Sequence, residues 1–210
     1  MSFYSHPEII RYFYRIKRLD KKARVMALDV GRKYIGCAIS CTEIKEAIPY
    51  KTYEIDPQYN QSNYDFGAHT DFYQMLMEDM RRRKIKSLVV GYPLDENKNI
   101  TPMCTFIENF CDHLLKEKIF PFPLTLIDEH RTTKEAALKM LKQNQSSPSR
   151  IAAGGMNEKA QPFGSYFKTQ LLYQKSVFDV LAAQTILERF LGMYNKEIES
   201  YKTIRNQELA

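Results

Sequence analysis

The chain of 210 residues contains no long apolar run. A helix that crosses a membrane needs ~20 consecutive apolar residues, and no stretch of this sequence approaches that length. The first residues, MSFYSHPEIIRYFYRIKRL, also lack the uninterrupted apolar centre of a secretory signal. We therefore expect no membrane partner and a cytoplasmic location. An organelle is the alternative, because this N-terminal segment is rich in arginine and amphipathic.

Cysteine is scarce, and its positions form no recognisable metal or redox motif. The four cysteines are Cys37, Cys41, Cys104 and Cys111, and no two of them make a C-x-x-C pair. We expect reduced thiols in the core of an intracellular protein. The sequence also lacks an internal repeat.

Apolar residues are plentiful enough for a real core. They make up 44% of the chain, against 27% charged residues, and the length suits one domain with extensions. We expect a basic and helical N-terminal extension over residues 1–23 and a main domain over 24–194. Within that domain, residues from about 144 to 170 are rich in Gly, Ser and Pro and predict a mobile insertion. Residues 195–210 are predicted to be a polar C-terminal tail.

Positive charge is concentrated in two short runs. The net charge of the chain is +6, and residues 11–24 hold seven basic residues and one acid, so the remainder is close to neutral. A second basic run, RRRKIK, covers residues 81–86. Such runs serve solubility or attract a polyanion such as RNA or DNA. Charge alone does not choose between these roles.

Apolar periodicity predicts a strand-rich first third followed by alternating helices and strands. The predicted strands are 25–30, 35–40, 47–55, 86–93 and 122–127. One predicted helix begins near Asp71, a second at Pro102 directly after the N-cap Thr101, and a third at the capping box of residues 132–135. The last predicted helix runs from about Leu171 to Tyr194. This order predicts an α/β fold with a mixed central sheet, opened by an antiparallel hairpin and covered by helices on both faces.

Four carboxylates stand at positions where chemistry is possible. Asp29 ends the first predicted strand, Asp128 and Glu129 follow a later one, and Asp179 lies on the packing face of the last helix. Ligands of open α/β sheets bind beyond the carboxyl ends of parallel strands. Converging carboxylates repel unless a cation lies between them, and oxygen ligands suit Mg²⁺ or Mn²⁺. Such ions can activate a water and stabilise the leaving oxygen of a phosphodiester.

Each acid also has a simpler interpretation when it is taken alone. Asp29 could cap the hairpin turn, and Asp128 or Glu129 could interact with the dipole of the helix that follows. Asp179 could pair with Lys175 near the start of its helix. The combination of all four favours a shared site, whereas each residue by itself leaves the choice open.

Four segments together resemble one known family. They are ALDVGRKYIGCAIS, SLVVGYPLDENKNITP, LTLIDEHRTTKEAALKML and FDVLAAQTILERFL, in that order over about residues 24–191. The chain resembles the YqgF (RuvX) family, described both as pre-16S rRNA nucleases and as Holliday junction resolvases, in the RNase H-like superfamily. The resemblance implies an RNase H-like fold for residues 24–194 and metal-dependent hydrolysis of phosphodiesters.

The resemblance also implies roles for individual residues. Its acidic positions fall on Asp29, Glu129 and Asp179, with Asp128 beside them, so the first three are the expected Mg²⁺ ligands and all four the expected catalytic residues. The expected substrate-binding residues are Gly31, Lys33, Gly91, Pro93, Lys98, His130 and Arg131.

Two positions depart from the family pattern. The family has Asp-Glu-Arg where this chain has Asp128-Glu129-His130, with Arg131 one place later. The family has Asp-Gly where this chain has Asn97-Lys98. Because the acids are all present, we expect retained activity with an altered substrate preference.

The leading hypothesis is a metal-dependent nuclease that acts on structured RNA in pre-rRNA processing, as a monomer or homodimer. The first alternative is a resolvase that cuts branched DNA, which needs a dimer with two sites. The second is a protein of the same fold that binds nucleic acid without cutting it. An actin-like ATPase begins with a similar Asp-x-Gly strand, but it needs a second lobe for which this chain has no room.

Overall fold

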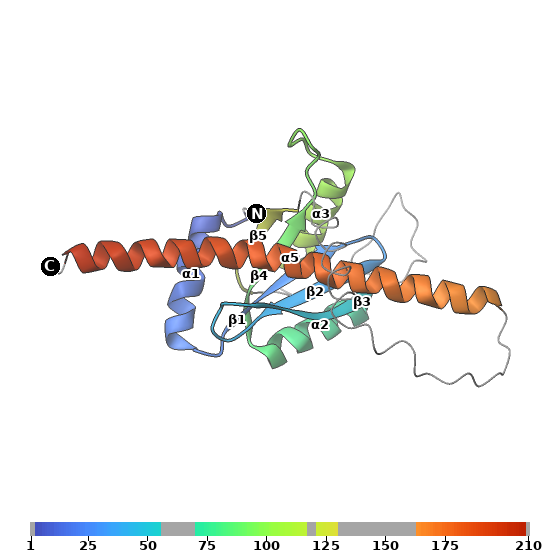
Figure 1. Ribbon diagram of the computed structural model, residues 1–210, viewed down its shortest axis with the longest axis horizontal. Coiled ribbons are helices and arrows are strands. Elements are labelled where there is room, and N and C mark those ends of the chain that lie inside the picture. The colour runs from blue at the N-terminus through green and yellow to red at the C-terminus, as the bar shows by residue number, and fades with distance from the viewer. Residues whose placement is uncertain (1–2, 56–69, 117–120, 130–162, 209–210) are drawn as a thin grey trace, which may run out of the picture.

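The computed structural model describes residues 3–55, 70–116, 121–129 and 163–208. Strands and helices in this part of the chain form a layered α/β structure (Figure 1). The described helices are α1 (His6–Leu19), α2 (Thr70–Arg83), α3 (Pro102–Lys116) and α5 (Phe163–Glu208). The strands are β1 (Arg24–Val30), β2 (Tyr34–Ser40), β3 (Ala47–Glu54), β4 (Ile85–Tyr92) and β5 (Leu124–Asp128). The helix predicted at residues 132–135 lies outside the described residues, as do residues 144–162 of the predicted insertion.

The strands form one mixed sheet in the order β3-β2-β1-β4-β5. Strands β1 and β2 make the predicted antiparallel hairpin, in which Asp29 lies opposite Gly36. Strands β4 and β5 then add in parallel to β1. This confirms the expected α/β class with a mixed sheet opened by an antiparallel hairpin. Because these three strands are parallel, the carboxyl ends of β1, β4 and β5 lie at the same end of the sheet.

Alternate residues of each strand serve two separate cores. Met26, Leu28 and Val30 of β1 pack with the buried residues of α2 and α3. Val25 and Ala27 pack on the other face, against α1 and α5. Helices therefore cover both faces of the sheet, as the sequence predicts (Figure 1). In the described part of the chain, no helix combines the length and apolarity that a membrane span needs.

Helix α3 begins where the sequence places its start. The N–H of Cys104 donates to the Thr101 side-chain oxygen at 3.3 Å, so Thr101 is the N-cap. The Thr101 hydroxyl itself donates to the carbonyl of Pro93 at 2.9 Å. This contact fixes the loop that follows β4, at the end of the sheet where the parallel strands have their carboxyl ends.

Helix α5 is longer than predicted and includes residues 195–208, for which the sequence predicts a polar tail. The helix begins at Phe163 and continues to Glu208, across the sheet and beyond it (Figure 1). Ile198 is 8% exposed, and Tyr201 packs against the same core as α1. The Arg11 guanidinium donates to the Tyr201 hydroxyl at 2.9 Å. Contact with α1 therefore supports a segment whose composition alone suggests a solvated end.

The N-terminal extension is bound to the domain. The N–H of Tyr4 donates to the Leu124 carbonyl at 3.1 Å, and the Thr125 hydroxyl donates to the Tyr4 carbonyl at 2.8 Å. Its helix α1 buries Ile9, Ile10 and Phe13. The segment before α1 thus covers part of the edge strand β5.

All four cysteines are free thiols, but only three belong to the core. Cys37, Cys104 and Cys111 are buried, whereas Cys41 is half-buried. Its sulfur accepts hydrogen bonds from the N–H groups of Lys45 and Glu46, each at 3.3 Å. The prediction of a core position is wrong for Cys41, because its sulfur closes a surface turn between β2 and β3.

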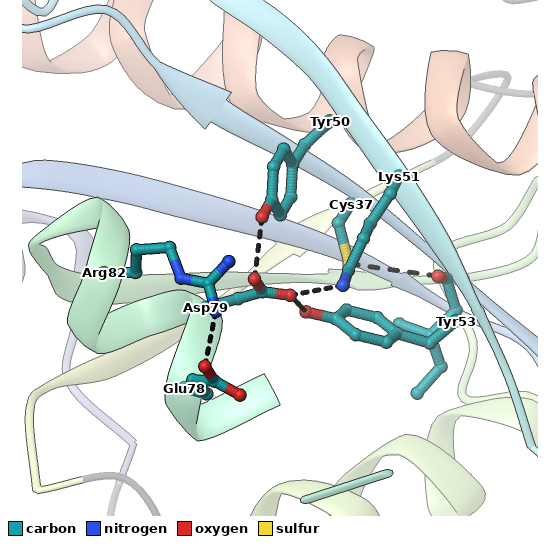
Figure 2. A network of polar contacts seen from close by, with 8 residues as sticks. Cys37, Tyr50, Lys51, Tyr53, Glu78, Asp79 and Arg82 are labelled. Carbon is teal, nitrogen blue, oxygen red and sulfur yellow. Dashed lines mark hydrogen bonds and ion pairs between the residues drawn. The ribbon is translucent and has the colours of Figure 1, made fainter. Parts of the chain in front are cut away.

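Asp79 joins α2 to β3 through a network of donors (Figure 2). The Tyr53 hydroxyl donates to Asp79 at 2.6 Å and the Tyr50 hydroxyl donates at 2.9 Å, while the Lys51 ammonium forms an ion pair with it. Burial opposes the charge of Asp79, but hydrogen bonds from Lys51 and the two tyrosines outweigh it and hold its pKa below the usual value. The carboxylate is therefore a well-satisfied structural anchor.

We expect Tyr53→Phe to lower the free energy of unfolding by about 1.5–3 kcal/mol, because a buried carboxylate loses one donor. Urea denaturation measures this change. The control is Tyr34→Phe, whose hydroxyl lies 3.5 Å from the exposed Glu54, and its expected effect is within about 0.5 kcal/mol. Equal effects of the two variants would contradict an anchoring role for Asp79.

Candidate functional site

The alternation of the strands directs two carboxylates toward α5. Asp29 lies two residues after Ala27, which is buried in the core shared with α1 and α5. Glu129 follows β5 directly and lies two residues after Ile127, which belongs to the same core. Side chains two apart on a strand share a face. Both acids are therefore at the carboxyl ends of parallel strands and on the face covered by α5.

Helix α5 brings Asp179 to the same place by a close approach to β2. A Cβ atom added to Gly36 would lie 2.0 Å from the backbone oxygen of Asp179. Gly36 in turn lies directly opposite Asp29 in the register of the hairpin. The helix is held there by Ala183, Ile186 and other side chains without any exposed surface. Glycine in the strand interior is thus what permits Asp179 to approach Asp29.

Gly91 provides room for the third acid. A Cβ atom at this position would lie 2.2 Å from Oε2 of Glu129 and 2.6 Å from a methyl carbon of Ile186. The Glu129 N–H also donates to the Tyr92 carbonyl at 3.2 Å, which fixes the chain as it leaves β5. The Glu129 carboxylate therefore occupies the space above a residue that has no side chain.

Burial and neighbouring carboxylates raise the pKa values of Asp29 and Glu129. Burial, followed by the charges of Glu129 and Asp179, raises the pKa of Asp29 well above its usual value. Burial and the charge of Asp128 raise the pKa of Glu129 to about 7, although Arg189 and a hydrogen bond with Asp29 oppose this rise. Raised pKa values in neighbouring carboxyl groups indicate a concentration of negative charge without enough compensation.

This arrangement fits a hard divalent cation. All three side chains offer oxygen ligands, and within the described residues Oε2 of Glu129 is buried without a hydrogen-bond partner. The described residues do not yet show a formed metal site. In the described part of the chain, no group of three or more His, Cys, Asp and Glu side chains is close enough together to hold a metal ion. The carboxylates are thus neighbours that a cation would have to draw together.

Asp128 lies apart from this group. It follows Ile127 on the strand, so its side chain points to the opposite face from Glu129. Its carboxylate is 2.6 Å from the ammonium of Lys98, although it still raises the pKa of Glu129. The backbone of Lys98 has a φ of 66°, in the left-handed region that favours glycine. The pairing offers a physical reason for a lysine at this strained position.

Two residues of the site were missed by the sequence reasoning. Gly36 controls the distance between α5 and the sheet, and the mark of this role in the sequence was a glycine inside an apolar strand. Arg189 donates to the Asp128 carbonyl at 2.7 Å and opposes the rise in the pKa of Glu129. The sequence signal for Arg189 was an arginine among the apolar residues of the last helix.

The other predicted substrate-binding residues lie near the same edge. The N–H of Gly31 donates to the Tyr34 carbonyl at 2.9 Å, so a backbone bond closes the hairpin turn. Lys33 in this turn is 3.5 Å from Glu54. Pro93 follows β4 and accepts the Thr101 hydroxyl. His130 and Arg131 lie outside the described residues.

The chain is similar to known proteins over most of its length. The family model RuvX, described as Holliday junction resolvase, matches residues 23–154. A protein of Mesomycoplasma hyopneumoniae (strain 7448) named "Putative pre-16S rRNA nuclease" is 32% identical over 174 residues, which cover 83% of this chain and 97% of the relative. A protein of the same name from Roseiflexus sp. (strain RS-1) is 31% identical over 122 residues, which cover 58% of this chain and 77% of the relative.

Among solved structures, Thermus thermophilus RuvC in complex with a Holliday junction substrate is similar with a TM-score of 0.43 at 12% sequence identity. The alignment covers 82% of this chain and 96% of that one.

We expect Gly36→Ala to lower the free energy of unfolding by about 3 kcal/mol or more, because a methyl group 2.0 Å from a backbone oxygen forces α5 away from β2. Gly192→Ala is the matched control. It lies on α5 with no atom within 4 Å of an added Cβ, and it should gain up to about 1 kcal/mol of helix stability. If urea denaturation gave Gly36→Ala a similar gain, the close approach of α5 would be contradicted.

We expect Glu129→Gln to stabilise the metal-free protein at high pH. With its pKa raised to about 7 in the fold, Glu129 costs no stability below the usual pKa of a glutamate and costs progressively more as the pH rises through about 7. The gain should therefore be small at about pH 5 and reach up to about 3 kcal/mol at about pH 8. Thermal unfolding in a chelator measures it. A gain independent of pH, or an equal gain in the exposed-site control Glu96→Gln, would count against the charge cluster.

Proposed function

The chain belongs to the RuvX family, and on this premise we propose that it is a metal-dependent nuclease that hydrolyses phosphodiester bonds in structured RNA, in the processing of pre-rRNA. Relatives that carry the pre-16S rRNA nuclease name support the choice of RNA. The observation that carries the proposal is the meeting of carboxylates from β1, from the end of β5 and from α5 on one face of the sheet.

In this proposal Asp29, Glu129 and Asp179 would hold Mg²⁺ or Mn²⁺. When bound, such ions supply an activated water and stabilise the leaving oxygen of a phosphodiester. The hydrogen bond between Asp29 and Glu129 is consistent with a shared proton, which the pair must release to bind a cation. The absence of a side chain at Gly91 keeps the space around the Glu129 carboxylate open.

The positive side chains near this edge have a proposed role in holding the substrate. Lys33 lies in the turn that follows Asp29, and Lys98 is 71% exposed beside Asp128. We propose that a substrate phosphate competes with Asp128 for the ammonium of Lys98. Asp128 then acts as a positioning residue for Lys98 and as a source of negative charge near Glu129, without being a metal ligand.

A resolvase acting on branched DNA is the second candidate, because the matching family model carries that description. The same three acids would serve either substrate, since the chemistry at the phosphodiester is the same. The two candidates differ in what surrounds the site: a resolvase needs two copies of the chain with two sites. A strictly monomeric protein in light scattering, both with and without a four-way DNA junction, would count against the resolvase.

We expect Asp29→Asn to reduce cleavage of an RNA stem-loop in Mg²⁺ by at least about a hundredfold, because one of the proposed ligands loses its charge. Binding of the same RNA, measured by fluorescence anisotropy in a chelator, should change little. The control is Asp112→Asn, which removes a surface carboxylate paired with Lys116 on α3 and should cleave at the wild-type rate.

The same assay with a panel of RNA stem-loops and DNA junctions distinguishes the remaining outcomes. Cleavage of the junctions alone would replace the RNA nuclease by the resolvase. Binding without cleavage in Mg²⁺ and in Mn²⁺ would favour a protein that only binds nucleic acid. Wild-type cleavage by Asp29→Asn would remove Asp29 from the catalytic site.

A further inference from the structure

Two basic segments that are distant in the sequence meet at the amino ends of the parallel strands. Arg24 begins β1 and pairs with Ile85, the first residue of β4. The N–H of Arg24 donates to the carbonyl of Lys84 at 3.0 Å, which joins the turn before β1 to the turn after α2. Figure 1 shows these two turns next to each other, below α1. They lie at the opposite end of β1 and β4 from the candidate site.

The joined segments line two adjoining hollows that share Lys84. We call their basic lining the distal basic surface, which consists of Lys21, Lys22, Arg24, Arg81, Arg82, Arg83, Lys84 and Lys86. The acids in the same lining are Asp20 and Glu43. The excess of positive charge on this surface equals the net charge of +6 of the whole chain. The rest of the molecule is therefore neutral on balance.

Three of the four lysines of this surface are available to a ligand. Lys21, Lys22 and Lys84 are exposed, and among the described residues none of their side chains forms an ion pair. Both acids of the lining already accept local hydrogen bonds, Asp20 from the backbone of Lys22 at 2.9 Å and Glu43 from the Thr42 hydroxyl at 2.7 Å. Among the described residues, neither carboxylate forms an ion pair with these lysines.

Lys84, in the turn after α2, has an unfavourable backbone conformation. Lys84 has a φ of 57°, in the region where glycine is favoured over a residue with a side chain. Its side chain is exposed and contributes to both hollows. A lysine at this position gives up some stability and adds a positive charge where the two hollows meet.

We propose that the distal basic surface is a second nucleic-acid contact, which binds the phosphate backbone of the substrate at a distance from the site of cleavage. Arg82 of this surface pairs with Glu78, but most of the other cations are exposed and form no ion pair among the described residues. Such a dense group of cations is what a polyanion recognises. The choice of nucleic acid rests on the proposed function. The contact is sequence-independent, because phosphates carry no base information.

The separation of the two regions predicts how much substrate is needed. Strand β1 has seven residues, so at ~3.3 Å per residue the basic surface lies roughly 20 Å from the carboxylates. A nucleic-acid strand advances ~3.4 Å per nucleotide. A substrate must therefore extend roughly six or more nucleotides from the scissile phosphate to contact both regions.

The first test measures binding without cleavage. The variant Lys21→Gln/Lys22→Gln/Lys84→Gln is compared with Lys116→Gln/Lys196→Gln/Lys202→Gln, which removes the same charge from exposed positions on α3 and α5. Anisotropy of a labelled RNA stem-loop is titrated in a chelator at several salt concentrations. We expect the first variant to bind more weakly and to flatten the plot of log affinity against log salt by roughly one unit per lost contact. The control should keep the wild-type slope.

An unchanged slope in the first variant, or an equal decrease in both variants, would overturn the proposal. Loss of binding to anionic lipid vesicles, with RNA binding retained, would also overturn it and assign the surface to a membrane. Because this assay needs no metal and no cleavage, its result is independent of the catalytic proposal.

The second test uses cleavage. On a substrate with about 15 nucleotides beyond the scissile bond, the first variant should raise KM and leave kcat unchanged. On one with about 3 nucleotides it should behave as wild type. Equal effects on both lengths would contradict a distant contact. Failure of the wild-type protein to cleave either substrate would reject the nuclease and leave the binding test to decide on the surface.

Discussion

The close approach of α5 to β2 at Gly36 is the constraint on which the candidate site depends. Asp29 lies in a strand and Glu129 directly after one, whereas Asp179 comes from a helix. The position of Asp179 is set by how near the helix backbone lies to the strand. Apolar side chains of α5 fill the same face and hold the helix in place. A site assembled in this way is sensitive to volume, because one methyl group at the contact separates its parts.

The surroundings of the acids shift their pKa values in two opposite directions. Asp79 receives hydrogen bonds from two tyrosines and an ion pair from a lysine, and its pKa is lowered. Asp29 and Glu129 have mainly other carboxyl groups as electrostatic neighbours, and their pKa values are raised. The first pattern joins two elements of the fold. The second gathers carboxyl groups with too little positive charge beside them, and a bound proton or a bound cation relieves that cost.

The parallel strands carry opposite charges at their two ends. Their carboxyl ends present the acids, while their amino ends carry basic residues from the turns before β1 and after α2. For a protein proposed to cut a polyanion, these ends have complementary roles: cations that attract the backbone, and acids that gather metal ions at the bond to be cut. Separation along the strands keeps the basic side chains from neutralising the acids.

The sequence by itself determined the elements and the identity of the acids. Apolar alternation located the hairpin and the later strands, and Thr101 marked the start of α3, because these patterns arise from local geometry. Only the tertiary structure decided that Asp128 turns to Lys98 instead of joining the other acids, that α5 continues past residue 194 and packs with α1 through Tyr201, and that Gly36 admits α5. Each of these depends on contacts between segments far apart in the chain, and no local pattern reports the distance between such segments.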